Sequence, residues 1–498
     1  MTQNLRQLAF LALRSVHRGA FADVAVDKVL SQSELAGSDR RLLTELVYGS
    51  VRRLRTLDAL IDQLAKKKAA QQPPDLRSIL HLGLYQLHYL DQIPDSAAVN
   101  TTVDLAKQNG FAGLAGFVNG VLRQYVRRAT SDGQQAMAEA DGEIRRSGDV
   151  ENEDAENSAI QNSSPLLNPD PSFSTPNSKL RTQNLKLLPP SLSLIERLGI
   201  LHSFPDWIVE VWLNQLGLEE TEQLCEWMNQ SPHIDLRINP LKATVESVES
   251  ALQTAGMSTN RIPHLPQALR LKNQVGPIQK LPGFQAGWWM VQDSSAQLVS
   301  YLVDPQPGEV VVDACAAPGG KTMHLAELMQ DEGVVWACDR TPSRLKKVRQ
   351  NAARLGLHTI KICTGDSRKL PQFVGKCDRV LIDAPCSGLG TLHRHADARW
   401  RQTPDSVKEL SILQAELLEQ AASWVKPEGV LIYATCTLHP AENEEVIQNF
   451  LTQHSTWQIE PPSPNSPPSA FVTPHGWVKV WSHRTDMDGF FMVRLKKS

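Results

Sequence analysis

Over the first 128 residues, apolar positions recur at the spacing of amphipathic helices. Leu5, Leu8, Ala12 and Val16, for example, fall on one helical face. The same spacing continues in further stripes, which are Leu43, Leu46, Val47 and Leu54; Leu57, Leu60, Ile61 and Leu64; Ile79, Leu80, Leu84 and Leu87; Val99 and Val103; and Phe117, Val121 and Leu122. We therefore predict an all-α bundle over residues 1–128.

In the last 200 residues or so, short uninterrupted apolar runs alternate with helical stretches. Runs of this length and composition are typical of strands buried on both faces. Strands are expected at residues 310–313, 334–338, 360–365, 380–382 and 430–433. The alternation predicts an open, mainly parallel sheet covered by helices. Residues 477–483 and 488–497 predict an antiparallel hairpin that closes this sheet.

Composition separates these two regions into different domains. Residues 129–188 are rich in Ser, Asn, Pro and acidic residues and bury too little apolar surface to fold alone, so we predict a disordered acidic linker. Connecting helices and a small α/β module are predicted over residues 189–285, and the larger α/β domain over residues 286–498. The chain is therefore expected to be multidomain.

The net charge of −3 gives no hint of a nucleic-acid partner, but its distribution is uneven. Residues 1–128 carry 17 Lys and Arg against 11 Asp and Glu, a net of +6, whereas residues 131–180 carry 3 against 10, a net of −7. Basic clusters of the bundle are thus candidates for phosphate contacts, although each alone also suits a solvated face. They are Arg40 and Arg41; Arg52, Arg53 and Arg55; Lys66, Lys67 and Lys68; and Arg127 and Arg128.

A glycine-containing turn follows the first strand of the α/β domain, in the string Cys-Ala-Ala-Pro-Gly-Gly-Lys at residues 315–321. Gly319 and Gly320 allow the backbone to approach a ligand closely. Cys315 stands where a phosphate-binding loop requires its first glycine, so that loop type is not indicated. Asp339 ends the next strand and suits the ribose hydroxyls of a nucleoside, and Asp366 follows the third strand, where it suits an adenine amino group. These residues predict a site for an adenosine cofactor.

Cys386 and Cys436 each follow an apolar run that reads as a strand of the same sheet. Carbon 5 of cytosine is a poor nucleophile, so its methylation requires a thiolate to add at carbon 6 and a base to remove the carbon 5 proton. A pair of cysteines at the carboxyl ends of neighbouring strands suits this reaction. The seven cysteines include no CxxC spacing, and the chain offers no apolar secretory segment, so a reducing cytoplasm is expected. No fourth ligand accompanies Cys386, His393 and His395, so we expect no metal.

Lowering the pKa of a catalytic thiol requires nearby positive charge. A helix predicted to begin near Pro440 would present its N-terminus to Cys436. Arg394 and Arg399 follow Cys386 and are candidates for adding positive potential and for binding a substrate phosphate, although a solvated loop face suits each of them as well.

Four strings of the α/β domain closely resemble the RNA 5-methylcytosine methyltransferases of the Nop2/Sun (Fmu) family, and this resemblance spans about residues 232–498. The strings are DACAAPGGK from Asp313, GDSRK from Gly365, DAPCSGLGTLHRHADARW from Asp383 and ATCTLHPAENEEV from Ala434. The bundle, including SDRRLLTELVYGSVR from Ser38 and FVNGVLR from Phe117, resembles the RNA-binding NusB-like domain. The fold that this implies is a NusB-like bundle, a small α/β module and a Rossmann-like class I methyltransferase domain that depends on S-adenosylmethionine.

The resemblance also implies roles for individual residues. Cys436 would be the nucleophile, and Cys386 would assist release of the methylated base. DNA cytosine methyltransferases instead use the cysteine of a Pro-Cys motif, which would transfer the nucleophile role to Cys386. Residues expected to hold S-adenosylmethionine are Cys315, Ala316, Ala317, Pro318, Gly319, Gly320, Lys321, Asp339, Asp366 and Asp383.

A NusB-like bundle joined to this catalytic domain resembles the bacterial RsmB subfamily, which implies a cytosine of 16S ribosomal RNA, of the cytosine 967 type, as the target. In the family the small α/β module helps hold RNA, so Arg237 and Asn239 are candidates for RNA contact or for structural roles. The alternatives are the same chemistry on tRNA or DNA, and a non-catalytic RNA-binding factor of ribosome assembly or transcription. We expect a cytoplasmic monomer with small-subunit ribosomal RNA as partner and no membrane segment.

Overall fold

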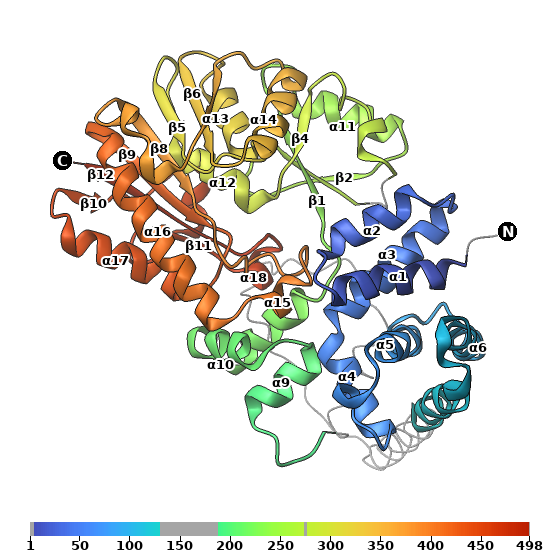
Figure 1. Cartoon of the computed structure of the whole chain (residues 1–498). Helices are drawn as coiled ribbons and strands as arrows, with labels where there is room; N and C mark the ends of the chain where they lie inside the picture. Colours follow the sequence, from blue (N-terminus) through green and yellow to red (C-terminus); the bar gives the residue numbers. More distant parts are fainter. Residues whose placement is uncertain (1–3, 130–187, 273–275, 498) are drawn as a thin grey trace, which may run out of the picture. The chain divides into compact units, whose positions relative to one another are not determined.

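The computed structural model describes residues 4–129, 188–272 and 276–497 of the chain (Figure 1). The predicted linker therefore lies, except for its two ends, outside the described residues. Two compact units divide the chain between Val209 and Glu210. None of the helices in the described ranges is both long and apolar enough to cross a bilayer.

The first unit is all helical, as the spacing of apolar residues predicts. Its helices are α1 (Leu5–His17), α2 (Ala22–Ser31), α3 (Gly37–Arg52), α4 (Leu54–Leu64), α5 (Pro74–Tyr89), α6 (Asp95–Ala106), a further helix at residues 115–129, and α9 (Leu194–His202). The apolar stripes form its core: Leu13, Leu43, Leu46 and Ile61 are completely buried.

The prediction of a basic surface on this unit is wrong for one of its four clusters. Arg52 and Arg53 are buried, and Arg55 donates to the Phe204 carbonyl at 2.6 Å and pairs with Asp206. These three arginines therefore stabilise the unit itself. The side chains of the other three basic clusters are exposed.

The second unit begins within α10 (Asp206–Trp227) and contains a small antiparallel sheet in the order β2-β3-β1-β4. Its strands are β1 (Ile234–Ile238), β2 (Thr259–Arg261), β3 (Ala268–Leu271) and β4 (Trp289–Val291), and α11 (Val245–Thr254) packs on it. Trp289 is completely buried in the core of this module.

A larger sheet follows, in the order β10-β12-β9-β8-β5-β6-β7, with β11 paired to β12. The central strands β7, β6, β5, β8 and β9 are parallel. Strand β12 is antiparallel to β9, and β10 and β11 are each antiparallel to β12, so β11 and β12 form the predicted antiparallel hairpin. The strands are β5 (Val310–Asp313), β6 (Val334–Asp339), β7 (Ile360–Thr364), β8 (Cys377–Asp383), β9 (Val425–Thr435), β10 (Trp457–Ile459), β11 (Val478–Val480) and β12 (Phe490–Lys497).

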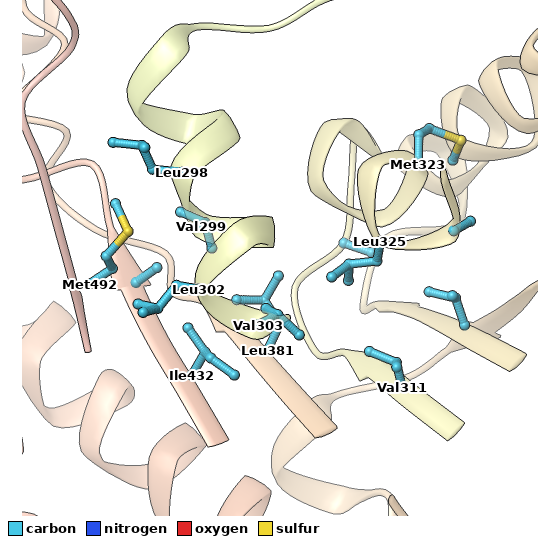
Figure 2. Packing of buried hydrophobic residues seen from close by; sticks show 14 of the residues in the cluster. Leu298, Val299, Leu302, Val303, Val311, Met323, Leu325, Leu381, Ile432 and Met492 are labelled. Carbon is cyan, nitrogen blue, oxygen red and sulfur yellow. The ribbon is translucent and has the colours of Figure 1, made fainter. Parts of the chain in front are cut away.

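Helices cover both faces of this sheet, which explains the uninterrupted apolar runs. Alternate strand residues belong to two different clusters: Leu381 and Ile432 lie on one face, and Ile382 and Tyr433 on the other. The first face is covered by α12 (Ser294–Val303), α13 (Gly320–Leu328) and α14 (Pro342–Leu355), and the second by α16 (Pro404–Trp424) and α17 (Glu444–Gln453). Figure 2 shows apolar side chains of α12 lying over Leu381 and Ile432, namely Leu298, Val299, Leu302 and Val303.

Candidate active site

The two cysteines singled out in the sequence lie side by side at the carboxyl edge of the larger sheet. Strands β8 and β9 are parallel neighbours, with Asp383 opposite Ala434, so the loops that follow them begin together. The Cys386 and Cys436 sulfur atoms are 3.4 Å apart, within hydrogen-bonding distance of each other, and both residues are free thiols. Both are partly exposed. The two thiols therefore form a single pair at this edge of the sheet.

Close packing of the two loops fixes this pairing. The Gly390 amide donates to the Cys436 carbonyl at 2.9 Å, and the Gly489 amide donates to the Gly390 carbonyl at 2.8 Å. A Cβ atom at position 390 would lie 2.0 Å from the Gly489 oxygen. Only glycine fits where three backbone segments meet this closely.

The surroundings of the Cys386 thiol favour its protonated form. Its pKa is raised well above the ordinary value, first because of the hydrogen bond with Cys436, then because of burial, and further because of negative charge on Cys436 and Glu442. If one proton is shared between the two sulfur atoms, it therefore belongs on Cys386.

A lysine supplies positive charge on the side of Cys436. Lys321, in the first turn of α13, donates to Asp383 Oδ2 at 2.7 Å, and its ammonium lies 5.0 Å from the centre of the Phe490 ring. Burial lowers the pKa of Lys321, but the charge and hydrogen bond of Asp383 and the charge of Cys436 outweigh burial, so this pKa is raised. The lysine is therefore a cation facing Cys436. The sequence placed it only among the cofactor residues, because nothing local indicates which carboxylate it meets.

Backbone hydrogen bonds hold the glycine turn against the tips of the neighbouring strands. Ala314 donates to the Leu381 carbonyl and Ala316 to the Cys338 carbonyl, each at 2.8 Å. Gly319 has a φ of 106°, in the region where other residues are strained. Cys315 is partly buried, and burial raises the pKa of its thiol, which disfavours a reactive thiolate at this position.

The acids expected at the strand ends lie where the sequence predicts. Asp339, at the end of β6, is buried, accepts from the Thr341 amide at 2.7 Å and forms an ion pair with Arg344 at 3.1 Å. Asp366 follows β7 and is held by the Arg368 side chain and amide, which lower its pKa to about 2. An ionised carboxylate retains free lone pairs beside such partners, so both acids fit the hydroxyl and amino groups of an adenosine cofactor. The turn and the two acids thus form one edge suited to that cofactor.

The charged groups expected to assist Cys436 from other loops do not do so. Residues 440–442 form only a short 3₁₀ turn, and α17 begins at Glu444 with two glutamates in its first turn, so the α-helix expected near Pro440 begins later and carries negative charge at its start. Arg399 is completely buried and donates to Asn229 at 2.9 Å. Arg394 is held by the carboxylates of Asp293 and Asp488 at 2.9 and 2.8 Å. Neither arginine is available to a substrate phosphate.

The two RNA-contact candidates of the small module are buried as well. Arg237 is completely buried and donates to both oxygens of Glu327, at 2.9 and 2.7 Å, and to the Gly320 carbonyl at 2.7 Å. Asn239 is also completely buried, and its side chain donates to the Leu355 carbonyl at 3.2 Å. Both therefore have structural roles.

Comparisons with known proteins agree with this architecture. The NusB family matches residues 3–127, a ferredoxin-like domain described as RsmF/B-like matches residues 204–278, and the family described as 16S rRNA methyltransferase RsmB/F matches residues 300–496. The predicted fold class, an all-α NusB-like bundle followed by a small α/β module and a Rossmann-like methyltransferase domain, is confirmed.

Several proteins of known name or structure are similar over most of their length. A Synechocystis protein named "Probable ribosomal RNA small subunit methyltransferase B" is 45% identical over 99% of both chains. Ribosomal RNA small subunit methyltransferase B of Serratia proteamaculans is 32% identical, again over 99% of both. The crystal structure of a methyltransferase homolog protein from Pyrococcus horikoshii is 29% identical, with a TM-score of 0.54, and covers 62% of this chain and 100% of its own.

Proposed function

Because the chain belongs to the ribosomal RNA small subunit methyltransferase B family, we propose that it methylates carbon 5 of a cytosine in 16S ribosomal RNA through a covalent bond to Cys436. Methylation of ribosomal RNA with S-adenosylmethionine as the donor follows from the family. The proposal concerns the atom, the intermediate and a target of the cytosine 967 type. The observation that carries it is the pair of thiols 3.4 Å apart, one beside a lysine and one beside a glutamate.

The reaction divides between the two sulfur atoms. The Cys436 thiolate, stabilised by the Lys321 ammonium, bonds to carbon 6, and the electron pair of the ring double bond moves to carbon 5. S-adenosylmethionine, when bound, supplies an electrophilic methyl group at carbon 5. After loss of the carbon 5 proton to a base, the double bond re-forms and Cys436 leaves as a thiolate. Cys386 holds its proton 3.4 Å from that sulfur and stabilises the departing thiolate by a hydrogen bond.

The cofactor site is assigned to the residues named from the sequence. The turn from Cys315 to Lys321 and the acids Asp339, Asp366 and Asp383 would hold S-adenosylmethionine, because they share the carboxyl edge of adjacent parallel strands with the two cysteines. Asp383 also fixes the Lys321 ammonium, so it connects cofactor binding with the state of Cys436. The target cytosine must be unpaired or flipped, because carbon 6 is attacked from the face of the ring.

Separate removal of each sulfur tests the two roles. Cys436→Ala should be inactive and form no adduct, whereas Cys386→Ala should accumulate protein covalently attached to RNA, visible as a slower band on a denaturing gel. Cys363→Ala, at a half-exposed thiol of β7, is the matched control and should turn over like the wild type. A Cys386→Ala enzyme that turns over freely without an adduct would reverse or remove the assignment.

Label transfer tests the substrate. Radiolabelled S-adenosylmethionine should label deproteinised small-subunit ribosomal RNA, and mapping of 5-methylcytosine in cells that lack the protein should show the loss of one position. Transfer only to tRNA or DNA would overturn the proposed substrate. The absence of any transfer would favour a non-catalytic RNA-binding factor.

A further inference from the structure

One buried carboxylate holds the residue that follows each cysteine. Glu442, the last residue of the 3₁₀ turn η9 (Pro440–Glu442), is completely inaccessible. Its Oε1 accepts from the Ser387 amide at 2.8 Å, and its Oε2 accepts from the Ser387 hydroxyl and, at 3.2 Å, from the Thr437 hydroxyl. Ser387 and Thr437 also contact each other at 2.8 Å. The loops carrying Cys386 and Cys436 are thus tied to the same two oxygen atoms.

Glu442 is itself fixed from two further directions. Gln414 of α16 donates to Glu442 Oε1 at 3.0 Å and to the carbonyl of Pro385, which precedes Cys386, at 2.9 Å. The Tyr433 hydroxyl of β9 donates to the Glu442 carbonyl at 2.6 Å. Burial raises the pKa of Glu442, an effect that hydrogen bonds from Ser387, Gln414 and Thr437 reduce. The backbone amide of Ser387 and the side-chain amide of Gln414 both donate to Oε1, so this oxygen acts as an acceptor and carries no proton.

The charged and titratable groups near the two sulfur atoms are unequally divided. The titratable groups that interact with Cys386 are Cys436, Glu442 and the Tyr433 phenol, and none of these three is a cation. Cys436 faces the Lys321 ammonium, which Asp383 holds in place. Negative charge nearby therefore disfavours a thiolate on Cys386.

We propose that Glu442 is a positioning residue of the methyl transfer, which fixes the spacing of the two cysteines and assigns their shared proton to Cys386. The catalytic consequence rests on the proposed roles of Cys436 and Cys386. The assignment of the proton can be tested without RNA or S-adenosylmethionine. A failure of this inference is therefore distinguishable from a failure of the proposed reaction.

The charge is tested by the reactivity of Cys386 in full-length protein that carries Cys436→Ser. Carbamidomethylation of Cys386 by iodoacetamide is followed against pH by mass spectrometry of the peptide that contains it. Glu442→Gln removes the negative charge but keeps the shape, because the Ser387 and Thr437 hydroxyls can turn to accept from an amide. The pH midpoint should fall by about one unit, which is about a tenfold faster reaction at a given pH below the midpoint. Glu445→Gln changes an exposed carboxylate three residues away and should leave the midpoint unchanged.

Activity separates positioning from general damage. In protein with both cysteines, Glu442→Gln should lower kcat with little change in the KM for S-adenosylmethionine. The alkaline limb of its pH–rate profile should fall at a lower pH than that of the wild type. Glu442→Asp keeps the charge on a shorter side chain and should retain the high Cys386 midpoint while kcat falls. An unchanged midpoint in Glu442→Gln, or an equal fall in both variants, would overturn the assignment of the proton. Unchanged kcat in both would overturn the positioning role.

Discussion

Burial at the tip of a strand changes the acid–base chemistry of Asp313. The side chain ends β5 directly before the glycine turn, is almost completely buried, and accepts from the Thr322 hydroxyl at 2.6 Å. Burial raises its pKa to about 7, the Thr322 hydrogen bond opposes this rise, and the negative charge of Asp383 adds to it. Between about pH 4 and pH 7, a large fraction of folded molecules therefore hold a proton that the unfolded chain, with an ordinary pKa near 3.8, has released.

Asp313 should therefore make stability depend on pH. Because the folded state binds the proton more tightly, its contribution to stability is fully present below about pH 3.8 and is lost as the pH rises to about 7. Relative to Asp313→Asn, the free energy of unfolding of the wild type should fall across this range, by up to about 1.4 kcal/mol per pH unit. Urea titrations at several pH values measure the difference.

Asp304→Asn serves as the control, because Asp304 is an exposed residue with a positive φ that asparagine also adopts. It should follow the wild type at every pH. If Asp313→Asn also ran parallel to the wild type, the pKa of this carboxyl would be the same in the folded and unfolded states, and burial would not raise it.

At this scale the sequence predicts positions better than partners. The two cysteines and the acids at strand ends follow from the ends of apolar runs, which are local features. The pairing of Lys321 with Asp383 joins residues 62 apart in sequence, and that of Ser387 with Glu442 joins residues 55 apart. Glu442 lies in ATCTLHPAENEEV, one of the strings that carry the family resemblance. A glutamate so close to Glu444 and Glu445 nevertheless gives no local sign that it is buried.

At the level of an element, strand β1 shows why the sequence left the role of Arg237 open between RNA contact and structure. From Asp235 to Ile238, every residue of this strand is buried, on both faces of the small sheet. The Arg237 side chain therefore points toward α13, where Glu327 and the Gly320 carbonyl accept its hydrogen bonds. In a strand where polar and apolar residues alternate, an arginine is expected on the solvent-exposed face. Here the second face of the sheet is also covered, so the arginine is buried. Arg237 therefore joins the small module directly to the first turn of α13 by a hydrogen bond.

Removal of Arg237 should be costly, because it leaves Glu327 as a buried, unpaired charge. Arg237→Met should lower the free energy of unfolding by about 3–5 kcal/mol, whereas Arg237→Met combined with Glu327→Met should recover most of that loss. Chemical denaturation measures both. Binding of S-adenosylmethionine, followed by calorimetry, should also weaken in the single variant, since the Gly320 carbonyl loses its donor.

The control for Arg237 is Arg261→Met, which breaks exposed ion pairs with Glu246 and Glu249. It should cost far less than Arg237→Met, because ion pairs exposed to water contribute little to stability. If Arg237→Met were no more destabilising than Arg261→Met, the buried pair would contribute little to holding the two elements together.

For the whole molecule, the periodicity of apolar residues predicts the succession of domains but not the order of strands. A helical bundle, a small module and a parallel sheet follow from spacings of three to four residues and from continuous runs. That β5 lies between β6 and β8 depends on pairing between distant segments, which no local pattern determines. The exact domain boundaries remain predictions, as does the disorder of the linker, most of which lies outside the described residues.

Affinity for RNA depends on the basic groups that reach phosphates, not on the net charge of −3. Within the bundle, the burial of Arg52 and Arg53 leaves exposed lysines such as Lys66 and Lys67 as candidates. If both contact phosphates, changing them to glutamine should weaken binding of a 16S ribosomal RNA fragment and reduce the slope of log Kd against log salt by roughly 1.4–1.8. At saturating RNA, kcat should be unchanged, because neither lysine belongs to the site.

Fluorescence anisotropy at several salt concentrations measures this slope. The matched control changes the equally exposed Lys346 and Lys347 of α14 to glutamine, which removes the same charge from the second unit. A smaller slope only in the first variant would locate phosphate contacts on the bundle, because a mere change of net charge would act equally in both. Slopes equal to that of the wild type would remove this lysine cluster from the RNA contact and leave the exposed arginines to account for binding by the basic bundle.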